Sequence, residues 1–271
     1  MLEMENVSFD YGNGITIFSH VSMKIGQGEM IALGGKNGCG KTTVTRLLMG
    51  LETPTSGRIL YNGRDLKDRE PAERGRFIGY VFQQPDRQMF RPTVWEEIAY
   101  GPKQMGCSPE EVQRRVRHAM EAARLTEVAQ SYPQTLSRGL KQRVAIASAM
   151  AMETEYLILD EPTSGQDGEE KYLLMDVLKR LHQEGMTIIL ITHDMEIMAA
   201  YCSRAIIMGY KTKAFDGTPE ELFTSRDDLQ ELGLNRPAAV TLSLSIPGMP
   251  YCPSMERFRE EAEKRLKGGR Q

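Results

Sequence analysis

The chain alternates between short, unbroken apolar runs and longer segments with helical periodicity. The apolar runs cover residues 30–33, 156–160 and 186–193. Runs of this length with few polar interruptions are typical of strands buried on both faces of a parallel sheet. Between the last two runs, leucines recur at helical spacing and the pattern ends at Gly185, a residue type that commonly terminates helices. The pattern predicts an α/β fold with helices packed on a mainly parallel sheet.

The middle and the end of the chain have a different pattern. Residues 86–151 are mostly helical in character, with apolar residues recurring at helical spacing. Residues 240–246, VTLSLSI, alternate as a strand does, whereas residues 255–267 form a charged segment with helical periodicity. We therefore expect a core over residues 1–225, which includes the helical part, and a short C-terminal extension over residues 226–271.

The composition is that of an ordinary globular protein and argues against several classes. Of the 271 residues, 40% are hydrophobic and 26% are charged, which is enough apolar material for a core. The formal net charge of −3 gives no reason to expect a nucleic-acid partner. The four cysteines include no CxxC pair, so we expect free thiols rather than a zinc site or a disulfide framework. The acidic N-terminus and the strand-length apolar runs predict neither a secretory signal nor a membrane-spanning helix.

The sequence GKNGCGKT at residues 35–42 matches the phosphate-binding motif GxxxxGK[ST]. Its glycines allow backbone N–H groups to point at phosphate oxygens, Lys41 can reach the β- and γ-phosphates, and the Thr42 hydroxyl can bind Mg²⁺. A glycine turn that contains a lysine by chance is the alternative. An apolar run before the motif and a helical pattern after it, with Val44, Leu47, Leu48 and Leu51 on one side, favour a functional phosphate-binding loop. The residues predicted to bind nucleotide here are Gly35, Lys36, Asn37, Gly38, Cys39, Gly40, Lys41, Thr42 and Thr43.

Two adjacent carboxylates follow the second apolar run, and a histidine ends the third. Asp160 and Glu161 would lie beyond the carboxyl end of a buried strand, where open α/β sheets bind their ligands. The first acidic residue typically holds Mg²⁺, and the second can orient or deprotonate the attacking water. Solvated turn carboxylates and a structural histidine are the alternatives. The matching position of His193 favours a contact with the γ-phosphate.

The order of these elements resembles that of ABC transporter ATPase subunits over about residues 1–225. The motifs that carry the resemblance are Tyr11, the loop at 35–43, Gln83, LSRGLKQR at 136–143, YLILDEPTSGQD at 156–167 and ITHD at 191–194. The resemblance implies a P-loop NTPase core with a mainly parallel sheet, an antiparallel β-subdomain and a helical subdomain at about residues 86–151.

The resemblance also assigns roles to single residues. It implies that Tyr11 stacks on adenine and that Gln83 contacts both Mg²⁺ and the catalytic water. It makes Glu161 the catalytic base, Asp167 the D-loop aspartate and His193 the switch histidine. Lys41 of the phosphate loop completes the catalytic residues. Asp160 joins Thr42 and Gln83 as a ligand of Mg²⁺.

In this family two ATPase domains face each other head to tail, and each nucleotide lies between them. Ser137 and Gly139 of the signature segment would then contact the nucleotide of the opposite subunit. The usual signature is LSGGQ, whereas this chain has Arg138 and Leu140 at two of its positions. Because the serine, the second glycine and a following helix are retained, we expect a working but modified signature. An impaired half-site within a heterodimer is the alternative.

Three further stretches resemble the energy-coupling factor (ECF) ATPases, which drive the import of vitamins and of cobalt or nickel ions. They are FQQPDRQMF at 82–90, TVWEEIAYGPKQMG at 93–106 and the tail LGLNRPAAVTLSLS at 232–245, which is helical in that subfamily. The resemblance implies a peripheral protein on the cytoplasmic face of the membrane. Its partners would be a second ATPase, identical or paralogous, an integral membrane coupling protein and a membrane component that binds the substrate.

Two other functions remain open at this point. A soluble ABC protein acting on ribosomes or DNA would usually carry two ATPase units or a long coiled-coil insertion, and this chain has one unit and no such insertion. A nucleotide-gated subunit that binds ATP but hardly hydrolyses it would differ in its ATPase rate within the assembled complex. The identity of any transported substrate cannot be read from these residues.

Overall fold

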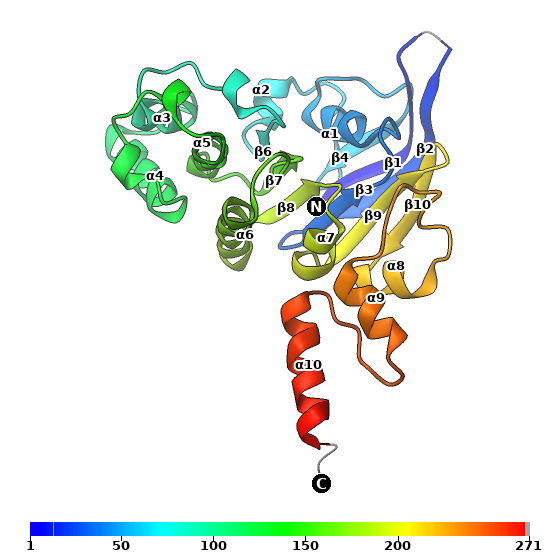
Figure 1. Ribbon diagram of the computed structural model, residues 1–271. Coiled ribbons are helices and arrows are strands. Elements are labelled where there is room, and N and C mark those ends of the chain that lie inside the picture. The colour runs from blue at the N-terminus through cyan, green and yellow to red at the C-terminus, as the bar shows by residue number, and fades with distance from the viewer. Residues whose placement is uncertain (13, 269–271) are drawn as a thin grey trace.

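The computed structural model describes residues 1–12 and 14–268, and at its centre is a six-stranded sheet (Figure 1). Its strands are β3 (Met30–Gly34), β6 (Ile78–Val81), β7 (Tyr156–Asp160), β8 (Thr187–Ile191), β9 (Arg204–Gly209) and β10 (Thr212–Gly217). The strand order is β10-β9-β3-β8-β7-β6, with only the β10–β9 pair antiparallel. All residues of β3, β7 and β8 are buried, which explains their unbroken apolar runs and confirms the predicted parallel core.

A second, antiparallel sheet covers one side of this core, as the family resemblance implied. It contains β1 (Leu2–Asp10), β2 (Thr16–Ile25), β4 (Ser56–Tyr61) and β5 (Arg64–Asp65), in the order β2-β1-β4-β5. Phe18 and Val21 of β2 are fully buried and share an apolar cluster with Ile31 and Ile189 of the larger sheet. The two sheets are therefore joined by one hydrophobic core.

Helix α1 (Lys41–Met49) follows the phosphate loop directly and runs from Gly40 to Gly50. Its buried residues Leu47 and Leu48 confirm the predicted apolar face. The prediction that Leu51 belongs to this face is wrong, because the helix has ended at Gly50, which has a φ of 75°, and Leu51 is 48% exposed.

Arg74, at the end of α2 (Pro71–Arg74), holds the last turn of α1 in place. Its guanidinium is buried and donates hydrogen bonds to the carbonyl oxygens of Leu47 and Leu48. The Leu47 carbonyl oxygen also accepts a hydrogen bond from the backbone N–H of Gly50, the residue that ends the helix. Carbonyl groups in the last turn lack the regular helical partner, so the arginine supplies them with a buried donor.

Residues 85–151 form the helical part, which lies on the side of the large sheet away from the antiparallel sheet (Figure 1). Its helices are α3 (Val94–Gln104), α4 (Pro109–Ala122) and α5 (Arg138–Ala151), with 3-10 turns at Pro85–Arg87, Thr126–Val128 and Pro133–Thr135. Ile98, Val116 and Ile146, one from each helix, are fully buried in the same apolar cluster. The helical character predicted for this stretch is therefore confirmed.

The remaining helices follow strands β7, β8 and β10 along the chain and continue into the C-terminal extension. They are α6 (Gly168–Gln183), α7 (Met195–Tyr201), α8 (Pro219–Ser225), α9 (Ala238–Ser245) and α10 (Met255–Gly268). The chain leaves α6 through Gly185, at a φ of 97°, as its sequence predicts. Helix α10, also predicted, projects away from the body of the molecule, whereas Leu232 and Leu234 pack the start of the extension into the main core (Figure 1).

The strand suggested by the alternation at residues 240–246 is wrong, and the helix implied by the family resemblance is correct. Helix α9 begins after Pro237, a residue type that is compatible with a helix start. Ala239, Val240 and Ser243 are buried, whereas Leu242 and Leu244 are exposed by 41% and 49%. The buried positions thus follow helical spacing, and the apolar residues that created the alternation lie on the surface.

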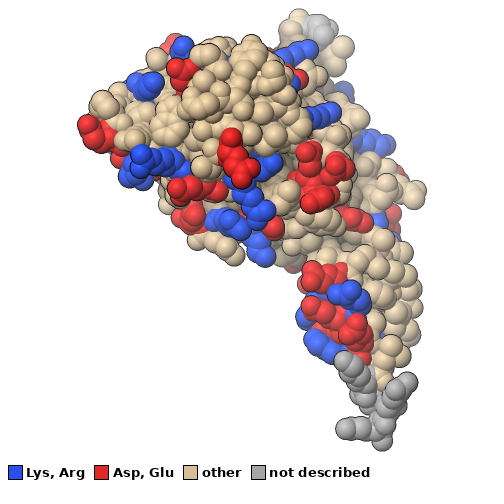
Figure 2. Space-filling model, turned by 60° about the vertical axis from the view of Figure 1, so that its left-hand side comes forward, with Lys and Arg blue, Asp and Glu red and all other residues tan. Residues whose placement is uncertain are grey.

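The surface carries charges of both signs. On the face shown in Figure 2, basic and acidic side chains are interspersed, and α10 carries both kinds. Within residues 1–12 and 14–268, no helix is long and apolar enough to cross a membrane. The four cysteines are unpaired, as expected.

Candidate functional site

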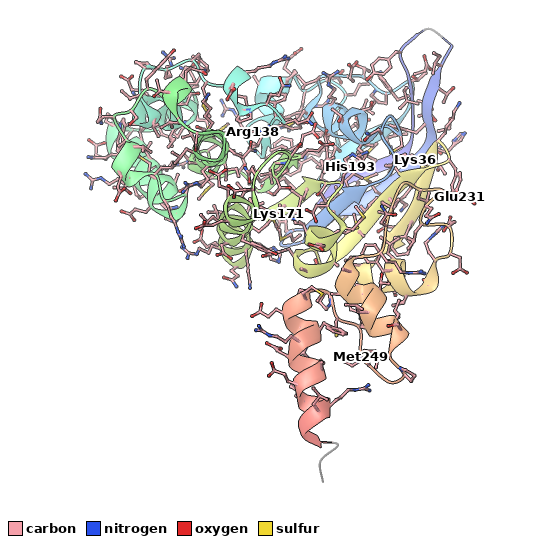
Figure 3. The ribbon with its side chains drawn as sticks, in the orientation of Figure 1. Lys36, Arg138, Lys171, His193, Glu231 and Met249 are labelled. Atoms are coloured by element: carbon pink, nitrogen blue, oxygen red, sulfur yellow. The ribbon has the colours of Figure 1, made fainter. Side chains whose placement is uncertain are left out.

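Most of the predicted site residues gather where the carboxyl ends of β3, β7 and β8 meet. The phosphate loop connects β3 to α1, Asp160 is the last residue of β7, and His193 follows β8. In Figure 3, Lys36 of this loop and His193 lie over the same end of the sheet. Because these strands are parallel, groups distant in the sequence converge on one edge of the sheet.

The phosphate loop depends on glycines with positive φ angles. Gly35, Gly38 and Gly40 have φ values of 130°, 79° and 99°, which side chains of L-residues rarely allow. At Gly35 there is also no space, because a methyl group there would lie 2.2 Å from the backbone oxygen of Met208 in β9. The loop conformation is therefore enforced both by φ and by the neighbouring strand.

Lys41 is enclosed by this loop. Its Nζ donates hydrogen bonds of 2.8 Å to the Gly35 carbonyl oxygen and 2.9 Å to the Lys36 carbonyl oxygen. The residue is only 6% exposed, and burial lowers the pKa of its ammonium group, although the carboxylates of Asp160 and Glu161 oppose this shift. The loop thus presents a lysine that is fixed in place and faces two carboxylates.

Asp160 lies beside the hydroxyl groups of Thr42 and Tyr80. Each hydroxyl donates a hydrogen bond of 3.3 Å to its Oδ2 atom. Burial raises the pKa of the Asp160 carboxyl, and burial together with the nearby carboxylate raises the pKa of Tyr80 to about 12. Tyr80 is not predicted from the sequence, and its signal would have been a hydroxyl-bearing residue near the end of the short strand that precedes Gln83.

Glu161 lies between Gln83 and His193. Gln83 Nε2 donates a hydrogen bond of 2.8 Å to Glu161 Oε2, and His193 Nε2 is 3.1 Å from Oε1. Glu161 has a φ of 47°, and its backbone N–H bonds to the carbonyl oxygen of Ile191 at the end of β8. A left-handed conformation in a residue other than glycine stores strain of about 1–3 kcal/mol, which is common at functional sites. The surroundings therefore fix both the backbone and the carboxylate.

His193 is uncharged near neutral pH. Burial and the positive charge of Lys41 lower its pKa below 6.5, although Glu161 and Asp160 act in the opposite direction. A neutral imidazole in this position donates from Nε2 to the Glu161 carboxylate. It can equally donate to an oxygen of a bound phosphate.

The remaining predicted residue on this side is Tyr11, which is 50% exposed. Its hydroxyl is 3.3 Å from Thr43 Oγ1, and its ring makes an edge-to-face contact with Phe9 at 4.8 Å. The phenol is therefore held next to the phosphate loop while much of the ring stays accessible. A flat ligand such as a nucleobase could stack there.

The donor atoms in this cluster fit Mg²⁺. Thr42, Asp160 and Gln83 offer oxygen atoms only, which is the donor type that Mg²⁺ prefers. Within the described residues, no group of three or more histidine, cysteine, aspartate or glutamate side chains could hold a metal alone. A metal bound here would therefore depend on oxygens of a bound phosphate as well as on the protein.

Ser137, Gly139 and Asp167 lie in a different place, at the starts of α5 and α6. Ser137 caps α5 by accepting a hydrogen bond from the Leu140 N–H group, and Asp167 caps α6 by accepting one from the Glu170 N–H group. Within the described part of the chain, no hydrogen bond or ion pair connects these three residues to Lys41 or Glu161. Within one copy of the chain, these three residues are therefore not bonded to the groups around Lys41 and Glu161.

A cavity of about 470 Å³ lies elsewhere, between α6, α7 and the C-terminal extension. Tyr172, His182, Tyr201 and Met255 are among its lining residues. None of the residues predicted to bind nucleotide lines it. The converging polar groups are therefore at an open edge of the sheet rather than in this cavity.

Comparisons with known proteins show which proteins the chain resembles. The family model described as ABC transporter matches residues 18–164. The energy-coupling factor transporter ATP-binding protein EcfA of Methanocaldococcus jannaschii is 36% identical over 245 residues, which are 89% of this chain and 88% of that protein. The chain spans less than half the length of other curated relatives, 46%, 45% and 40% of three that are 38–39% identical to it.

Two solved structures share the fold. The structure of cbiO1 from Clostridium perfringens, part of the ABC transporter complex cbiONQ, has a TM-score of 0.78 and 32% identity, and the match covers 90% of this chain and 98% of cbiO1. A dimeric ATP-binding cassette in a post-hydrolysis state with ADP and Pi has a TM-score of 0.71 and 27% identity, with 81% of this chain and 99% of that chain covered.

Proposed function

The chain belongs to the ABC transporter family of ATPases, and from this premise we propose that it is the ATP-hydrolysing motor subunit of an ECF-type importer. In this function, ATP closes a dimer of ATPase subunits, and hydrolysis followed by product release opens it. The movement drives uptake of a micronutrient, a vitamin or a metal ion, through membrane partners. The likeness to EcfA and to cbiO1 supports this proposal.

One observation carries the hydrolytic part of the proposal, and it is the position of Glu161. Its carboxylate is held by Gln83 and His193 next to a fixed lysine, at the edge where the phosphates would lie. A carboxylate oriented in this way can position a water molecule and accept its proton as the water attacks the γ-phosphate. A binding module without hydrolysis would not need a strained, doubly oriented carboxylate.

The other residues have separate roles in this proposal. The loop N–H groups and Lys41 bind the phosphates, and Tyr11 stacks on the base. Mg²⁺, held by Thr42, Asp160 and Gln83, would neutralise phosphate charge. His193 donates from Nε2 to the γ-phosphate and so stabilises charge that develops during transfer. Gln83 keeps Glu161 in place until nucleotide is bound.

The second half of the site would come from another subunit. Ser137, Gly139 and Asp167 lie at the starts of two helices and do not join the lysine and glutamate of their own chain. In a head-to-tail dimer they would face the nucleotide bound by the partner, with helix N-termini directed at the phosphates. The partner is a second copy or a paralogue, and the modified signature favours a paralogue.

The membrane partners would bind near the segment that connects β6 to α3, on the cytoplasmic face of the membrane. Phe82 and Phe90 in this segment are exposed by 44% and 62%, although both are large and apolar. Arg91 lies 4.3 Å from the ring centre of Tyr100 and adds a cation to the same surface. Exposed apolar residues grouped with a cation are typical of protein interfaces.

The proposal is tested by purifying the tagged chain from its native membranes in mild detergent and identifying its partners by mass spectrometry. We expect a polytopic membrane protein and a second ATPase subunit. Phe90→Ser should reduce recovery of the membrane protein. Tyr172→Ser, which changes a similarly exposed aromatic residue on α6, should not. Recovery of only ribosomal or DNA-associated proteins would refute the transporter function and leave an ABC ATPase with a soluble partner.

A second test concerns the pH dependence that His193 confers. Because its pKa lies below 6.5, acid pH protonates His193, and the cation would pair with Glu161 and weaken that carboxylate as a base. ATP hydrolysis by the assembled complex should therefore decline at acid pH, at a pH lower than that at which an ordinary histidine is protonated. His193→Ala should reduce the rate about 100-fold at neutral pH and remove this part of the profile.

His118→Ala is the matched control, because His118 lies on the exposed surface of α4. In this variant, phosphate release measured between about pH 5.5 and 8 should follow the same pH profile as in the parent. A His193→Ala complex with the parental rate and the same acid decline would contradict the role proposed for His193.

A further inference from the structure

The signature segment contacts the D-loop, the residues just before and including Asp167, through the side chain of Arg138, which lies over Gly165. Gly165 of the D-loop has a φ of 69°, and a methyl group added to it would lie 2.5 Å from Nη1 and 2.9 Å from Cζ of Arg138. The Arg138 guanidinium therefore occupies the space above Gly165. This contact places the cation between the starts of α5 and α6. Figure 3 labels Arg138 beside α5.

A second contact of the same kind lies beside the first. A methyl group added to Gly139 would lie 2.3 Å from the carboxyl group of Glu170, in the first turn of α6. Glu170 thus covers the signature glycine, and Arg138 covers the D-loop glycine. Two loops that are separate in the sequence are packed together by these reciprocal contacts.

Arg138 has no charged partner among the residues that the structure describes. Its side chain is exposed, and within residues 1–12 and 14–268 its guanidinium forms no hydrogen bond and no ion pair, not even with Glu170. By contrast, Arg143 of the same helix donates hydrogen bonds to the carbonyl oxygens of Ala123 and Arg124. Arg138 therefore presents five unused N–H donors and a full positive charge.

We propose that Arg138 binds the phosphates of the nucleotide held by the partner subunit. This inference rests on the proposed head-to-tail dimer, in which Ser137 and Gly139, on either side of Arg138, face that nucleotide. Closure of the dimer removes water from this surface, and a cation without an anionic partner is strongly unfavourable in such a place. The triphosphate supplies the anion, and the planar guanidinium matches phosphate oxygens well.

The modified signature then has a different role from that of a weakened LSGGQ segment. In place of a flexible glycine, the chain offers a cation that the D-loop keeps in position. The substitution then adds a contact to the nucleotide instead of merely tolerating the loss of one. Arg138 becomes a nucleotide-binding residue that acts across the dimer interface.

The test measures the ATP concentration at which half of the subunits are dimeric, in a Glu161→Gln background in which ATP hydrolysis is strongly slowed. The protein is this chain alone or with the second ATPase that co-purifies with it. Arg138→Met, which keeps the length and removes the charge, should raise this concentration about tenfold or more. Arg138→Lys should give a concentration between those of the parent and of Arg138→Met. Arg117→Met, at an exposed and unpaired arginine of α4, is the matched control and should have no effect.

The affinity of the monomer for a fluorescent ATP analogue separates a contact across the interface from damage to the chain itself. In Arg138→Met it should equal that of the parent, because each monomer binds nucleotide with its own phosphate loop. A weakened monomer affinity would overturn the proposal, because Arg138 would then act through its own fold.

Two further results would overturn it. One is an Arg138→Met protein that dimerises at the parental ATP concentration. The other is an Arg138→Gly protein that needs more ATP to dimerise while Arg138→Met needs no more than the parent. That result would mean that Arg138 only fills space over Gly165. In both cases the parental dimer would remain, so the proposed function would stand. If the Glu161→Gln parent itself failed to dimerise with its partner and saturating ATP, the proposed function would fail instead.

Discussion

Glu161→Gln is expected to slow ATP hydrolysis by about 10²–10⁴-fold while ATP still binds. Glutamine has nearly the same shape as glutamate and keeps one acceptor oxygen for either Gln83 or His193, which lie 2.8 Å and 3.1 Å from the two carboxylate oxygens. It cannot accept a proton from the attacking water. Single-turnover release of phosphate by the assembled complex measures the chemical step directly.

The same variant should accumulate as an ATP-bound dimer, because the step that separates the subunits is blocked. Light scattering after size-exclusion chromatography, with ATP present, measures this state. Glu169→Gln is the matched control, since Glu169 is an exposed carboxylate in the first turn of α6, and it should hydrolyse ATP at the parental rate. A Glu161→Gln protein that hydrolyses ATP normally would exclude Glu161 as the base.

The parts of this fold that could be predicted from the sequence are those whose signal is local. The strands β3, β7 and β8 are buried on both faces, so each one appears as an apolar run. The phosphate loop is a contiguous motif, and Asp160 and His193 occupy the ends of two predicted strands. Because parallel strands bring their carboxyl ends together, the convergence of these residues followed from the strand assignments.

The parts that could not be predicted depend on contacts between distant segments. Tyr80 approaches Asp160 only because β6 and β7 are neighbours in the sheet, and no motif marks it. The contact of Arg138 with Gly165 likewise requires that the starts of α5 and α6 lie together. The sequence suggested that Arg138 is a tolerated substitution, whereas the structure shows a cation in a defined position.

The C-terminal extension shows a third kind of difficulty. The segment at 240–246 alternates in hydrophobicity, yet it forms α9 because its burial is decided by the surface on which it packs. Leu242 and Leu244 are exposed on that helix, so the alternation does not report a buried face. Periodicity predicts structure only where the apolar positions are the buried ones.

Gly35→Ala is expected to destabilise the chain by about 3 kcal/mol or more and to abolish measurable binding of ATP. The added methyl group would lie 2.2 Å from the Met208 carbonyl oxygen and 2.8 Å from Cys39 Sγ, and the φ of 130° is unfavourable for alanine. Met208 is fully buried and lies in the antiparallel pair of β9 with β10. A shift of its carbonyl would therefore disturb the pairing of these two strands. The loop must shift instead, which displaces the two carbonyl oxygens that hold Lys41.

Gly38→Ala provides the control within the same loop. Gly38 also has a positive φ, 79°, but a methyl group there would meet no atom within 4 Å. Only backbone strain remains, so the nucleotide-free protein should lose about 1 kcal/mol of its free energy of unfolding. Urea denaturation without nucleotide compares the two variants, and titration with a fluorescent ATP analogue measures binding. Equal losses of stability would show that the Met208 carbonyl imposes no constraint, and the phosphate loop would then owe its conformation to φ alone.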